Sequence, residues 1–230
     1  MGGCSGVAEN EIRAVLFDLD GVIIESREVI EEAWRAAALH HTGTRLSEED
    51  IHEHVHGRPG SHTVATLFPD HTPPQRKEIW AHVDRIEETA QYRAVPGVRD
   101  FIAWLGTTGV PVGLVTSSWA EKIEHVIGLF DLDRVFATVV SRDDVANGKP
   151  HPEPYRSGCA RLGVDPASTL VFEDALSGVR SSVAAGSRCI GIGGDELVRA
   201  GAVASVPDFT HLPRSARSFT AGALKVVLQP

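Results

Sequence analysis

Short apolar segments that recur along this chain are the feature that most constrains its fold. The first covers residues 13–18 and ends in an aspartate, and residues 169–173 end in a glutamate in the same way. Similar segments lie at 112–116, 137–140 and 188–192, and helix-length stretches lie between them at 98–107, 120–128, 152–162 and 175–185. Strands that alternate with helices pack as a parallel sheet with helices on both faces. The sequence therefore predicts a Rossmann-like α/β fold, which binds ligands at the C-terminal ends of its strands.

Residues 26–91 interrupt this alternation. They are rich in His, Glu and Arg, and their apolar residues follow helical spacing at 27–40, 48–55 and 74–91. We expect an all-helical insert at 26–91, placed after the first strand of a core made of residues 1–25 and 92–230. The Val-Pro-Gly sequence at 95–97 is a suitable return hinge, because Pro and Gly commonly end regular structure.

The formal net charge of -9 over 230 residues argues against some partners. A protein that binds a nucleic-acid backbone usually carries a basic surface. No apolar run approaches the ~20 residues of a membrane span, and residues 1–10 lack the basic and apolar parts of a secretory signal. We therefore expect a cytoplasmic protein that binds neither nucleic acid nor membrane, as a monomer or a weak homodimer.

The three cysteines, Cys4, Cys159 and Cys189, predict no metal site and no disulfide framework. They are odd in number, far apart in the sequence and without nearby Cys or His at zinc-ligand spacing. We expect them to be reduced thiols.

An Asp-Leu-Asp-Gly sequence, from Asp18 to Gly21, follows the first predicted strand. Gly21 permits a sharp turn, so that Asp18 and Asp20 can face one site. One carboxylate can then attack a phosphorus atom while the other handles the proton of the leaving oxygen. The same string also occurs in ordinary turns and calcium loops, although the later ligands of an EF-hand are missing here.

Three further segments lie at or just past the ends of predicted strands. Thr116 and Ser117 offer hydroxyl and backbone N–H groups to a phosphate at a helix start, or form an ordinary helix cap. Lys149 lies between Gly148 and Pro150 and is either a phosphate ligand or a solvated loop lysine. Glu173 and Asp174 would be costly to bury side by side, and a divalent cation would offset their charge.

Taken together, these four segments resemble the motifs of the haloacid dehalogenase superfamily of phosphotransferases, in order and in context, from Val15 to about Gly193. The resemblance implies a phosphatase in which Asp18 is the nucleophile and Asp20 the general acid and base. It implies that Thr116 and Lys149 bind the transferring phosphoryl group. It also implies an Mg²⁺ ion on Asp18, the Asp20 carbonyl and Asp174, with Glu173 helping directly or through water.

The helical insert resembles the small cap of the beta-phosphoglucomutase-like branch of that superfamily. The mutases of this branch carry a histidine twelve positions after the nucleophile, where this chain has Ile30. The sequences His56-Gly57-Arg58 and Lys149-Pro150-His151-Pro152-Glu153-Pro154-Tyr155 look instead like sugar-phosphate and glycerol-phosphate phosphatases. We therefore expect Glu25, His56, Gly57, Arg58 and Ser117 to contact substrate, although Glu25 has the alternative of bracing the hinge.

Two other functions stay open at this point. One is a sugar phosphomutase, which Ile30 disfavours, and the other is a regulatory protein that keeps the fold without catalysis. A dehalogenase is disfavoured because that chemistry does not use a second aspartate such as Asp20. The expected substrate is a small phosphorylated metabolite, a sugar or polyol phosphate.

Overall fold

A computed structural model describes residues 11–212, 218–220 and 223–225. The described chain divides into two compact units. The sheet unit holds the residues up to 23, residues 94–118 and the residues from 132 onward, and the helical unit holds residues 24–93 and 119–131. Each unit has a hydrophobic core of its own.

Six parallel strands form the sheet, in the order β5-β4-β1-β6-β7-β8. They are β1 (Ala14–Phe17), β4 (Val112–Val115), β5 (Thr138–Val140), β6 (Thr169–Glu173), β7 (Arg188–Ile192) and β8 (Ala204–Val206). The central strands β1 and β6 are buried along their whole length, as expected for a parallel sheet covered on both faces. The predicted fold class is confirmed, and β8 adds an edge strand that the sequence analysis did not identify.

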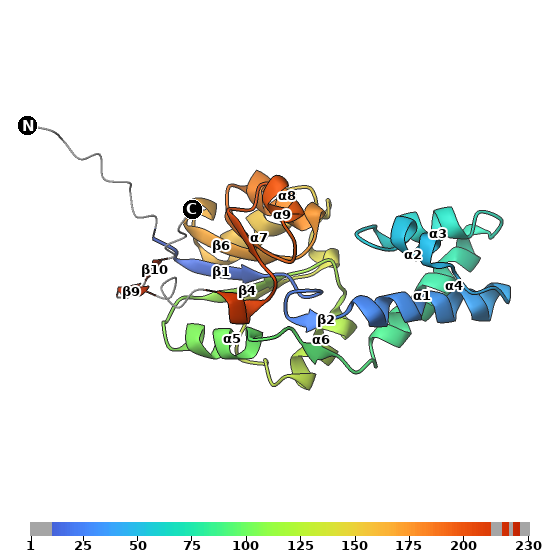
Figure 1. Cartoon of the computed structure of the whole chain (residues 1–230), viewed down its shortest axis with the longest axis horizontal. Helices are drawn as coiled ribbons and strands as arrows, with labels where there is room; N and C mark the ends of the chain where they lie inside the picture. Colours follow the sequence, from blue (N-terminus) through green and yellow to red (C-terminus); the bar gives the residue numbers. More distant parts are fainter. Residues whose placement is uncertain (1–10, 213–217, 221–222, 226–230) are drawn as a thin grey trace, which may run out of the picture. The chain divides into compact units, whose positions relative to one another are not determined.

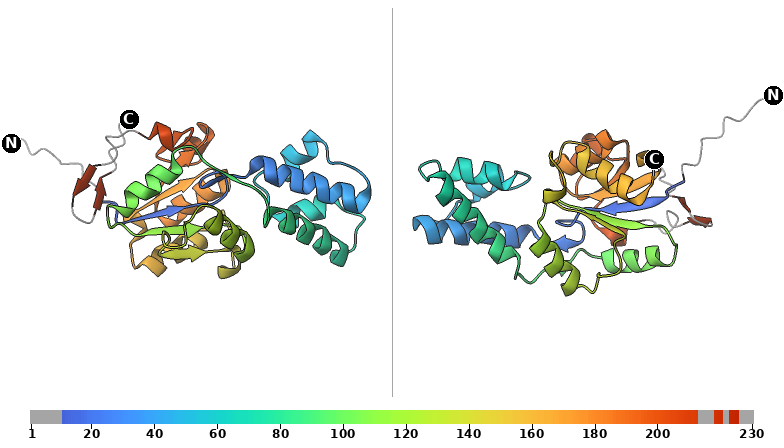
Figure 2. Two further views of the ribbon diagram at one scale, coloured as in Figure 1. Left: turned by 90° about the horizontal axis from the view of Figure 1, so that it is seen from below. Right: turned by 180° about the vertical axis from the view of Figure 1, so that it is seen from behind.

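Side chains alternate between the two faces of this sheet. Leu16 and Val171 face a core that includes Tyr155, beneath the helices α7 (Glu153–Leu162), α8 (Leu176–Ala185) and α9 (Glu196–Arg199). Phe17 and Phe172 stack on the other face with ring centroids 5.2 Å apart, and Phe101 from α5 (Val98–Gly106) packs against both. Figures 1 and 2 show these helices on opposite sides of the strands.

The helical unit contains α1 (Arg27–Thr42), α2 (Glu48–His54), α3 (Gly60–Leu67) and α4 (Pro73–Glu87). Its core is lined by apolar residues from all four helices, among them Trp34, Ile51, Val64 and Ile79. The Ser47 hydroxyl accepts a hydrogen bond from the Asp50 N–H, 3.1 Å away, and caps α2 where the sequence predicted a helix start. The helix α3 was not predicted.

Helix α6 (Ala120–Leu129) groups with the helical unit, whereas the sequence analysis placed all residues from 92 onward in the core. The Lys122 ammonium lies 2.6 Å from the Glu87 carboxylate, and both side chains are buried. The Trp119 indole N–H donates to Glu88 over 2.7 Å. These contacts tie α6 to the end of α4, and the sequence of a short amphipathic helix does not say which neighbour its apolar face covers.

The remaining elements are short. β2 (Ile24–Glu25) and β3 (Arg93–Ala94) pair where the chain passes between the two units, and β9 (Ser218–Thr220) pairs with β10 (Ala223–Lys225) in antiparallel fashion. Three short 3-10 helices complete the described chain: η1 (Arg142–Asp144), η2 (Pro166–Ser168) and η3 (Phe209–His211). Cys159 and Cys189 are buried free thiols, as predicted, and Cys4 lies outside the described residues. Within the described part of the chain, no helix combines the length and the apolar character that crossing a membrane requires.

Candidate active site

Asp18 is the first residue after β1, and it is 7% exposed. Its N–H continues the sheet by donating to the carbonyl of Phe172, 3.0 Å away. Gly21 then turns the chain with φ +70°, a conformation that favours glycine. A Cβ atom on Gly21 would also collide with the carboxylate of Asp174. Glycine is therefore required here both for the turn and for the close approach of the acid.

Lys149 joins the ends of three neighbouring strands. Its Nζ donates to Asp18 Oδ1 at 2.7 Å, to Glu173 Oε1 at 2.6 Å and to the carbonyl of Val115 at 3.0 Å. An ammonium group has three N–H donors, and each one is used. The side chain is 7% exposed, so Lys149 is not a solvated loop lysine.

Glu173 and Asp174 complete the site at the end of β6. Glu173 is fully buried, and its carboxylate occupies the space that a Cβ atom on Gly178 would need. One carboxylate oxygen from each of Asp18, Glu173 and Asp174 can be chosen so that all three lie within 4.8 Å of one another. The Asp174 carboxylate has no hydrogen-bond partner among the described residues.

The electrostatics of this group reflect an excess of negative charge. The pKa of Asp18 is raised to about 7: burial is the largest cause, Glu173 and Asp20 act in the same direction, and Lys149 opposes them. Asp174 has an exposed side chain, but its pKa is also raised, first by the loss of hydration around its carboxylate and then by Glu173, Asp18 and Asp20. Burial alone would lower the pKa of Lys149, but Asp18 and Glu173 outweigh burial and raise it. One lysine does not neutralise these acids, and a divalent cation would.

The donor set fits such a cation. Carboxylate oxygens are the ligands that Mg²⁺ prefers, and Mg²⁺ usually takes only one or two of them and keeps several waters. Asp174 is available as a ligand because its carboxylate is unpaired, whereas Glu173 Oε1 already accepts from Lys149 and from Tyr155. The residues present therefore suit a divalent metal held by oxygen atoms.

Thr116 and Ser118 are both buried just past the end of β4, and the Ser118 N–H donates to Thr116 Oγ1 at 3.0 Å. The Ser118 hydroxyl donates to Asp20 Oδ2 at 2.8 Å. Ser117, which the sequence analysis selected as a substrate contact, lies between them and is exposed. The residue that the sequence analysis missed is Ser118, which is buried like Thr116 and contacts Asp20.

The segment from Lys149 to Tyr155 has a structural explanation. The Glu153 carboxylate accepts from the backbone N–H groups of Ala146 at 2.7 Å and Asn147 at 3.1 Å, which fixes the loop that carries Lys149. The hydroxyl of the fully buried Tyr155 donates to Glu173 Oε1 at 2.6 Å. Neither residue was singled out from the sequence as part of the site, although both lie in the quoted string.

The other predicted substrate contacts lie in the helical unit. Glu25 accepts from Arg93 Nε at 2.9 Å, which is the bracing contact between β2 and β3. His56 Nε2 lies 2.9 Å from Glu31 Oε1, Gly57 has φ +65°, and the exposed Arg58 donates to the carbonyl of Glu53 at 3.4 Å. A role for Glu25, His56, Gly57 and Arg58 in substrate binding stays a prediction.

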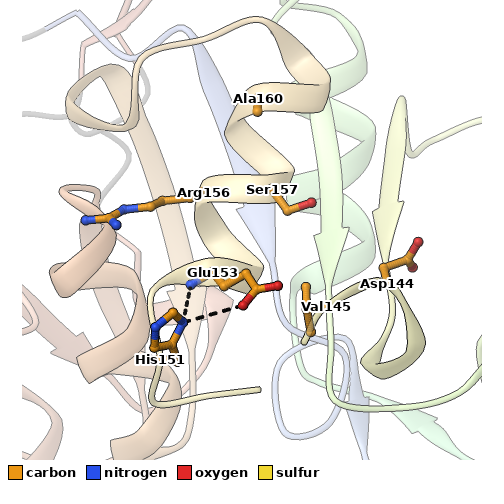
Figure 3. A pocket seen from close by; sticks show the side chains of 7 residues that line it. All are labelled: Asp144, Val145, His151, Glu153, Arg156, Ser157 and Ala160. Carbon is orange, nitrogen blue, oxygen red and sulfur yellow. Dashed lines mark hydrogen bonds and ion pairs between the residues drawn. The ribbon is translucent and has the colours of Figure 1, made fainter. Parts of the chain in front are cut away.

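A hollow of about 420 Å³ on the sheet unit is lined by Asp144, Val145, His151, Glu153, Arg156, Ser157 and Ala160 (Figure 3). Its charged side chains and His151 are paired with each other or with groups elsewhere: His151 Nδ1 lies 3.7 Å from Glu153, Arg156 donates to the carbonyl of Ala184, and Asp144 accepts from Arg161. None of the predicted catalytic or metal-binding residues lines it. We therefore place the candidate active site at the strand ends and not in this hollow.

Comparison with known proteins agrees with this geometry. The model of the haloacid dehalogenase-like hydrolase family matches residues 15–192. The chain is 31% identical over 206 residues to a phosphorylated carbohydrates phosphatase of Thermotoga maritima, which covers 85% of this chain and 94% of that protein. It is 30% identical over 184 residues to hexitol phosphatase A of Escherichia coli K12, which covers 78% and 82%.

A solved structure from Thermotoga maritima, described as a candidate beta-phosphoglucomutase, superposes with a TM-score of 0.70 at 30% identity. The match covers 85% of this chain and 94% of that one. The family model spans the first strand with its acids, the helical insert, the loop of Lys149 and the strand that ends in Glu173. The resemblance seen in the sequence is confirmed, and this chain is an enzyme of the haloacid dehalogenase-like hydrolase family.

Proposed function

We propose that this enzyme is an Mg²⁺-dependent phosphatase that hydrolyses a small sugar or polyol phosphate through an aspartyl-phosphate on Asp18. The observation that carries this proposal is the convergence of Asp18, Glu173 and the Val115 carbonyl on the ammonium of Lys149, with the unpaired Asp174 beside them. This arrangement supports the proposal, because the mechanism needs a nucleophile, a fixed cation and metal ligands together at the sheet edge where α/β proteins bind ligands.

The reaction proceeds in two displacements. A carboxylate oxygen of Asp18 attacks the phosphorus atom, the bond from phosphorus to the substrate oxygen breaks, and that oxygen takes a proton from Asp20. Asp20 then removes a proton from water, whose oxygen attacks the phosphorus of the aspartyl-phosphate. Phosphate leaves, the Asp18 carboxylate is restored and Asp20 is protonated again. The hydrogen bond from Ser118 to Asp20 orients this proton carrier.

Asp18, the Asp20 carbonyl and Asp174 would hold the metal, with Glu173 helping directly or through water. Bound there, Mg²⁺ would offset the negative charge of the carboxylates and of the phosphoryl oxygens. Lys149 and Thr116 bind the phosphoryl group, because its spread negative charge needs fixed donors as the in-line geometry forms. Tyr155 and Glu153 orient Glu173 and the loop of Lys149.

The names of the relatives support the substrate class. They are phosphatases of phosphorylated carbohydrates and of hexitol phosphates, and the chain shares their family and most of their length. Mutase activity is disfavoured, because the position of the mutase histidine is Ile30, whose partly buried side chain packs against the helical core. The apolar side chain of Ile30 cannot carry a proton as the histidine of a mutase would.

The test is phosphate release from a panel of sugar, polyol and nucleotide phosphates with Mg²⁺. We expect the Asp18→Asn variant to lose turnover by more than about a thousandfold, because the nucleophile is gone. Asp100→Asn, which changes an exposed acid on α5, is the matched control and should retain activity. Full turnover of Asp18→Asn in a clean preparation would overturn the mechanism.

The mutase alternative is tested with beta-glucose 1-phosphate. A phosphatase releases free glucose and phosphate from this compound. Accumulation of glucose 6-phosphate would instead identify phosphoryl transfer within the sugar.

A further inference from the structure

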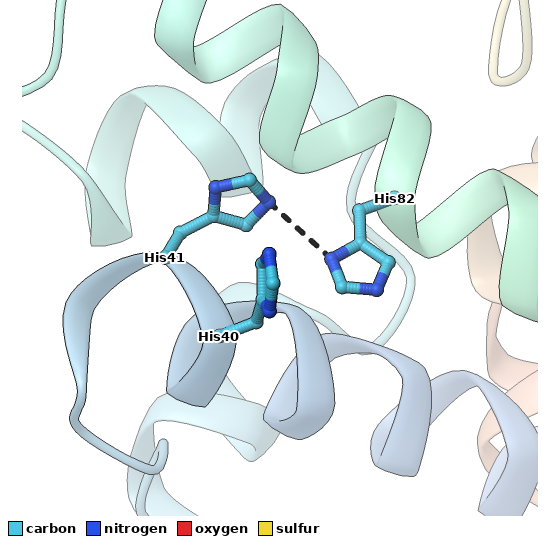
Figure 4. A group of neighbouring side chains, drawn as sticks. All are labelled: His40, His41 and His82. Carbon is cyan, nitrogen blue, oxygen red and sulfur yellow. Dashed lines mark hydrogen bonds between the residues drawn. The ribbon is translucent and has the colours of Figure 1, made fainter.

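Three histidines lie together in the helical unit. His40 and His41 are in the last turn of α1, and His82 is in α4 (Figure 4). His41 Nε2 and His82 Nδ1 are 3.3 Å apart. The ring of His40 lies edge-on to both others, with centroids 4.8 Å from His41 and 4.9 Å from His82. One nitrogen from each ring can be chosen so that all three lie within 4.8 Å of one another.

Core packing fixes the backbone that carries these rings. Ala37, one turn before His41, is fully buried, and so are Ile79 and Val83, which flank His82 on α4. These residues belong to one hydrophobic cluster in which α1 and α4 pack together. The histidines therefore meet at a rigid junction between two helices, and only their χ angles need to change for the rings to adjust.

The chemistry of the three rings suits a transition metal ion. Neutral imidazole nitrogens bind Zn²⁺, Cu²⁺ and Ni²⁺ in preference to Mg²⁺, which prefers oxygen. A tetrahedral Zn²⁺ ion with nitrogen ligands at about 2.0–2.1 Å places those nitrogens roughly 3.3 Å apart. The nitrogens of His41 and His82 already have this spacing.

The surroundings favour the neutral form of His41 and of His82. Burial and the neighbouring His40 lower the pKa of His41 and of His82, and His41 adds to this effect on His82. Arg85 acts in the same direction on both residues, and His71 does so on His41, while the charge of Glu78 opposes them at His41. Neutral histidines offer lone pairs to a metal without first releasing protons.

We propose that His40, His41 and His82 bind one Zn²⁺ ion that ties the last turn of α1 to α4, separate from the metal of the candidate active site. His41 binds through Nε2 and His82 through Nδ1, so their protons lie on Nδ1 and Nε2 respectively. The rotation of His40 brings in the third nitrogen, and water completes the tetrahedron.

The test is a calorimetric titration of the tag-free, full-length protein with Zn²⁺ in saturating Mg²⁺, which occupies the oxygen site first. We expect one equivalent of Zn²⁺ to bind. His41→Gln and His82→Gln should each weaken this binding by more than about tenfold, since even the loss of an outer partner of a ligand costs about this much. His62→Gln, which changes an exposed histidine elsewhere in the unit, is the matched control and should bind as wild type does.

Titration with Co²⁺ supplies a second measurement, because tetrahedral Co²⁺ gives strong visible absorption bands. In wild-type protein, nitrogen NMR of the rings should show Zn²⁺ at Nε2 of His41 and Nδ1 of His82, a readout that needs no variant to fold. Equal Zn²⁺ affinity in wild type and both Gln variants, or complete displacement of Zn²⁺ by Mg²⁺, would overturn the site. Phosphate release by His82→Gln should stay at the wild-type level, which separates this proposal from the proposed function.

Discussion

At the level of single residues, one oxygen of Glu173 accepts hydrogen bonds from both the Lys149 ammonium and the Tyr155 hydroxyl. This fully buried carboxylate would otherwise be free to turn away from the strand end. Its partners hold it where Lys149 also reaches Asp18. Under the proposed mechanism, Tyr155 would act as a positioning residue, because it holds the Glu173 carboxylate beside Lys149 and Asp18.

We expect Tyr155→Phe to lower kcat/KM by about tenfold and to raise the Mg²⁺ concentration for half-maximal activity, as the loss of outer-shell partners does at metal sites. The phenyl ring fills the same space, so the protein should fold. Tyr92→Phe is the matched control, since Tyr92, the only other tyrosine, donates to the Glu87 carbonyl in the helical unit at 2.9 Å. Identical Mg²⁺ dependence of the two variants would contradict the positioning role.

The acids were predictable because parallel strands bring their carboxyl ends to one edge, and Asp18, Glu173 and Asp174 lie directly at the ends of apolar segments. Lys149 lies in the loop after the segment at 137–140 and was selected as a lysine between Gly148 and Pro150. Ser118 and Tyr155 were not predictable, because their roles depend on contacts with Asp20 and Glu173 that sequence spacing does not reveal. The sequence analysis selected Ser117, but the structure buries Ser118 and leaves Ser117 exposed after β4. One residue of register decides such a choice.

At the level of elements, α6 depends on a buried ion pair. Lys122 reaches Glu87 in α4, and its Nζ lies 5.7 Å from the Tyr92 ring centroid and 5.6 Å from that of Trp119. Removing one member of a buried ion pair leaves the other charge buried without a partner, which is destabilising. Replacing both members by apolar residues leaves no such charge. The pair therefore fixes the packing of α6 against α4 more than it adds to net stability.

We expect Lys122→Met to lower the free energy of unfolding by about 3–5 kcal/mol, because it leaves Glu87 charged and buried. The double variant Lys122→Met/Glu87→Leu should recover much of that loss. Urea unfolding followed by tryptophan fluorescence measures both, and Lys77→Met, which changes an exposed lysine on α4, is the control. A double variant as unstable as the single one would show that the pair is not the source of the effect.

The contact between η1 and α7 predicts that the free energy of unfolding depends on pH. Asp144 in η1 accepts from Arg161 of α7 at 2.7 Å and from the Ser141 N–H at 2.8 Å, and these contacts lower its pKa from 3.8 to about 2. A lowered folded-state pKa adds stability above pH 3.8 that is lost as the pH falls toward 2. Both side chains are partly exposed, so we expect less than about 1 kcal/mol.

Comparing Asp144→Asn with wild type in urea at pH 6 and pH 2.5 tests this expectation. The stability difference should be present at pH 6 and should shrink at pH 2.5, where Asp144 of the unfolded chain is protonated and the folded-state carboxylate begins to take up a proton as well. A difference that is constant over this range, or that grows at low pH, would contradict the assignment. Asp143→Asn, at the exposed neighbouring carboxylate, should show no such trend.

The pattern of apolar residues predicted the central strands and α1, α2 and α4, because long periodic segments have only one way to bury their apolar side. The sequence pattern did not predict helix α3, because this helix starts with Gly60 and contains Ser, Thr and Val, which are weaker helix formers. Its helical state depends on packing, with Val64 in the core of the unit. Tertiary contacts of this kind are not visible in a local window.

At the level of the whole molecule, each of the two units has, among the residues that the structure describes, a hydrophobic core and a cluster of side chains that could hold a metal ion. The clusters differ in chemistry: carboxylate oxygens in the sheet unit and imidazole nitrogens in the helical unit. We therefore expect Mg²⁺, a hard cation, at the carboxylates and Zn²⁺, a borderline cation, at the histidines. It also allows the two sites to be tested independently in one protein.

Mg²⁺ should therefore stabilise the protein through the carboxylates alone. A ligand that binds only the folded state adds about 2.7 kcal/mol at a hundred times its dissociation constant, by mass action. Mg²⁺ would bind there because its charge offsets the burial and the neighbouring acids that raise the pKa of Asp18 and Asp174. Thermal unfolding of wild type, Asp174→Asn and His82→Gln with and without Mg²⁺ measures this effect. We expect the Mg²⁺ response to be largely lost in Asp174→Asn and retained in His82→Gln, and an equal response in all three proteins would place the Mg²⁺ ion elsewhere.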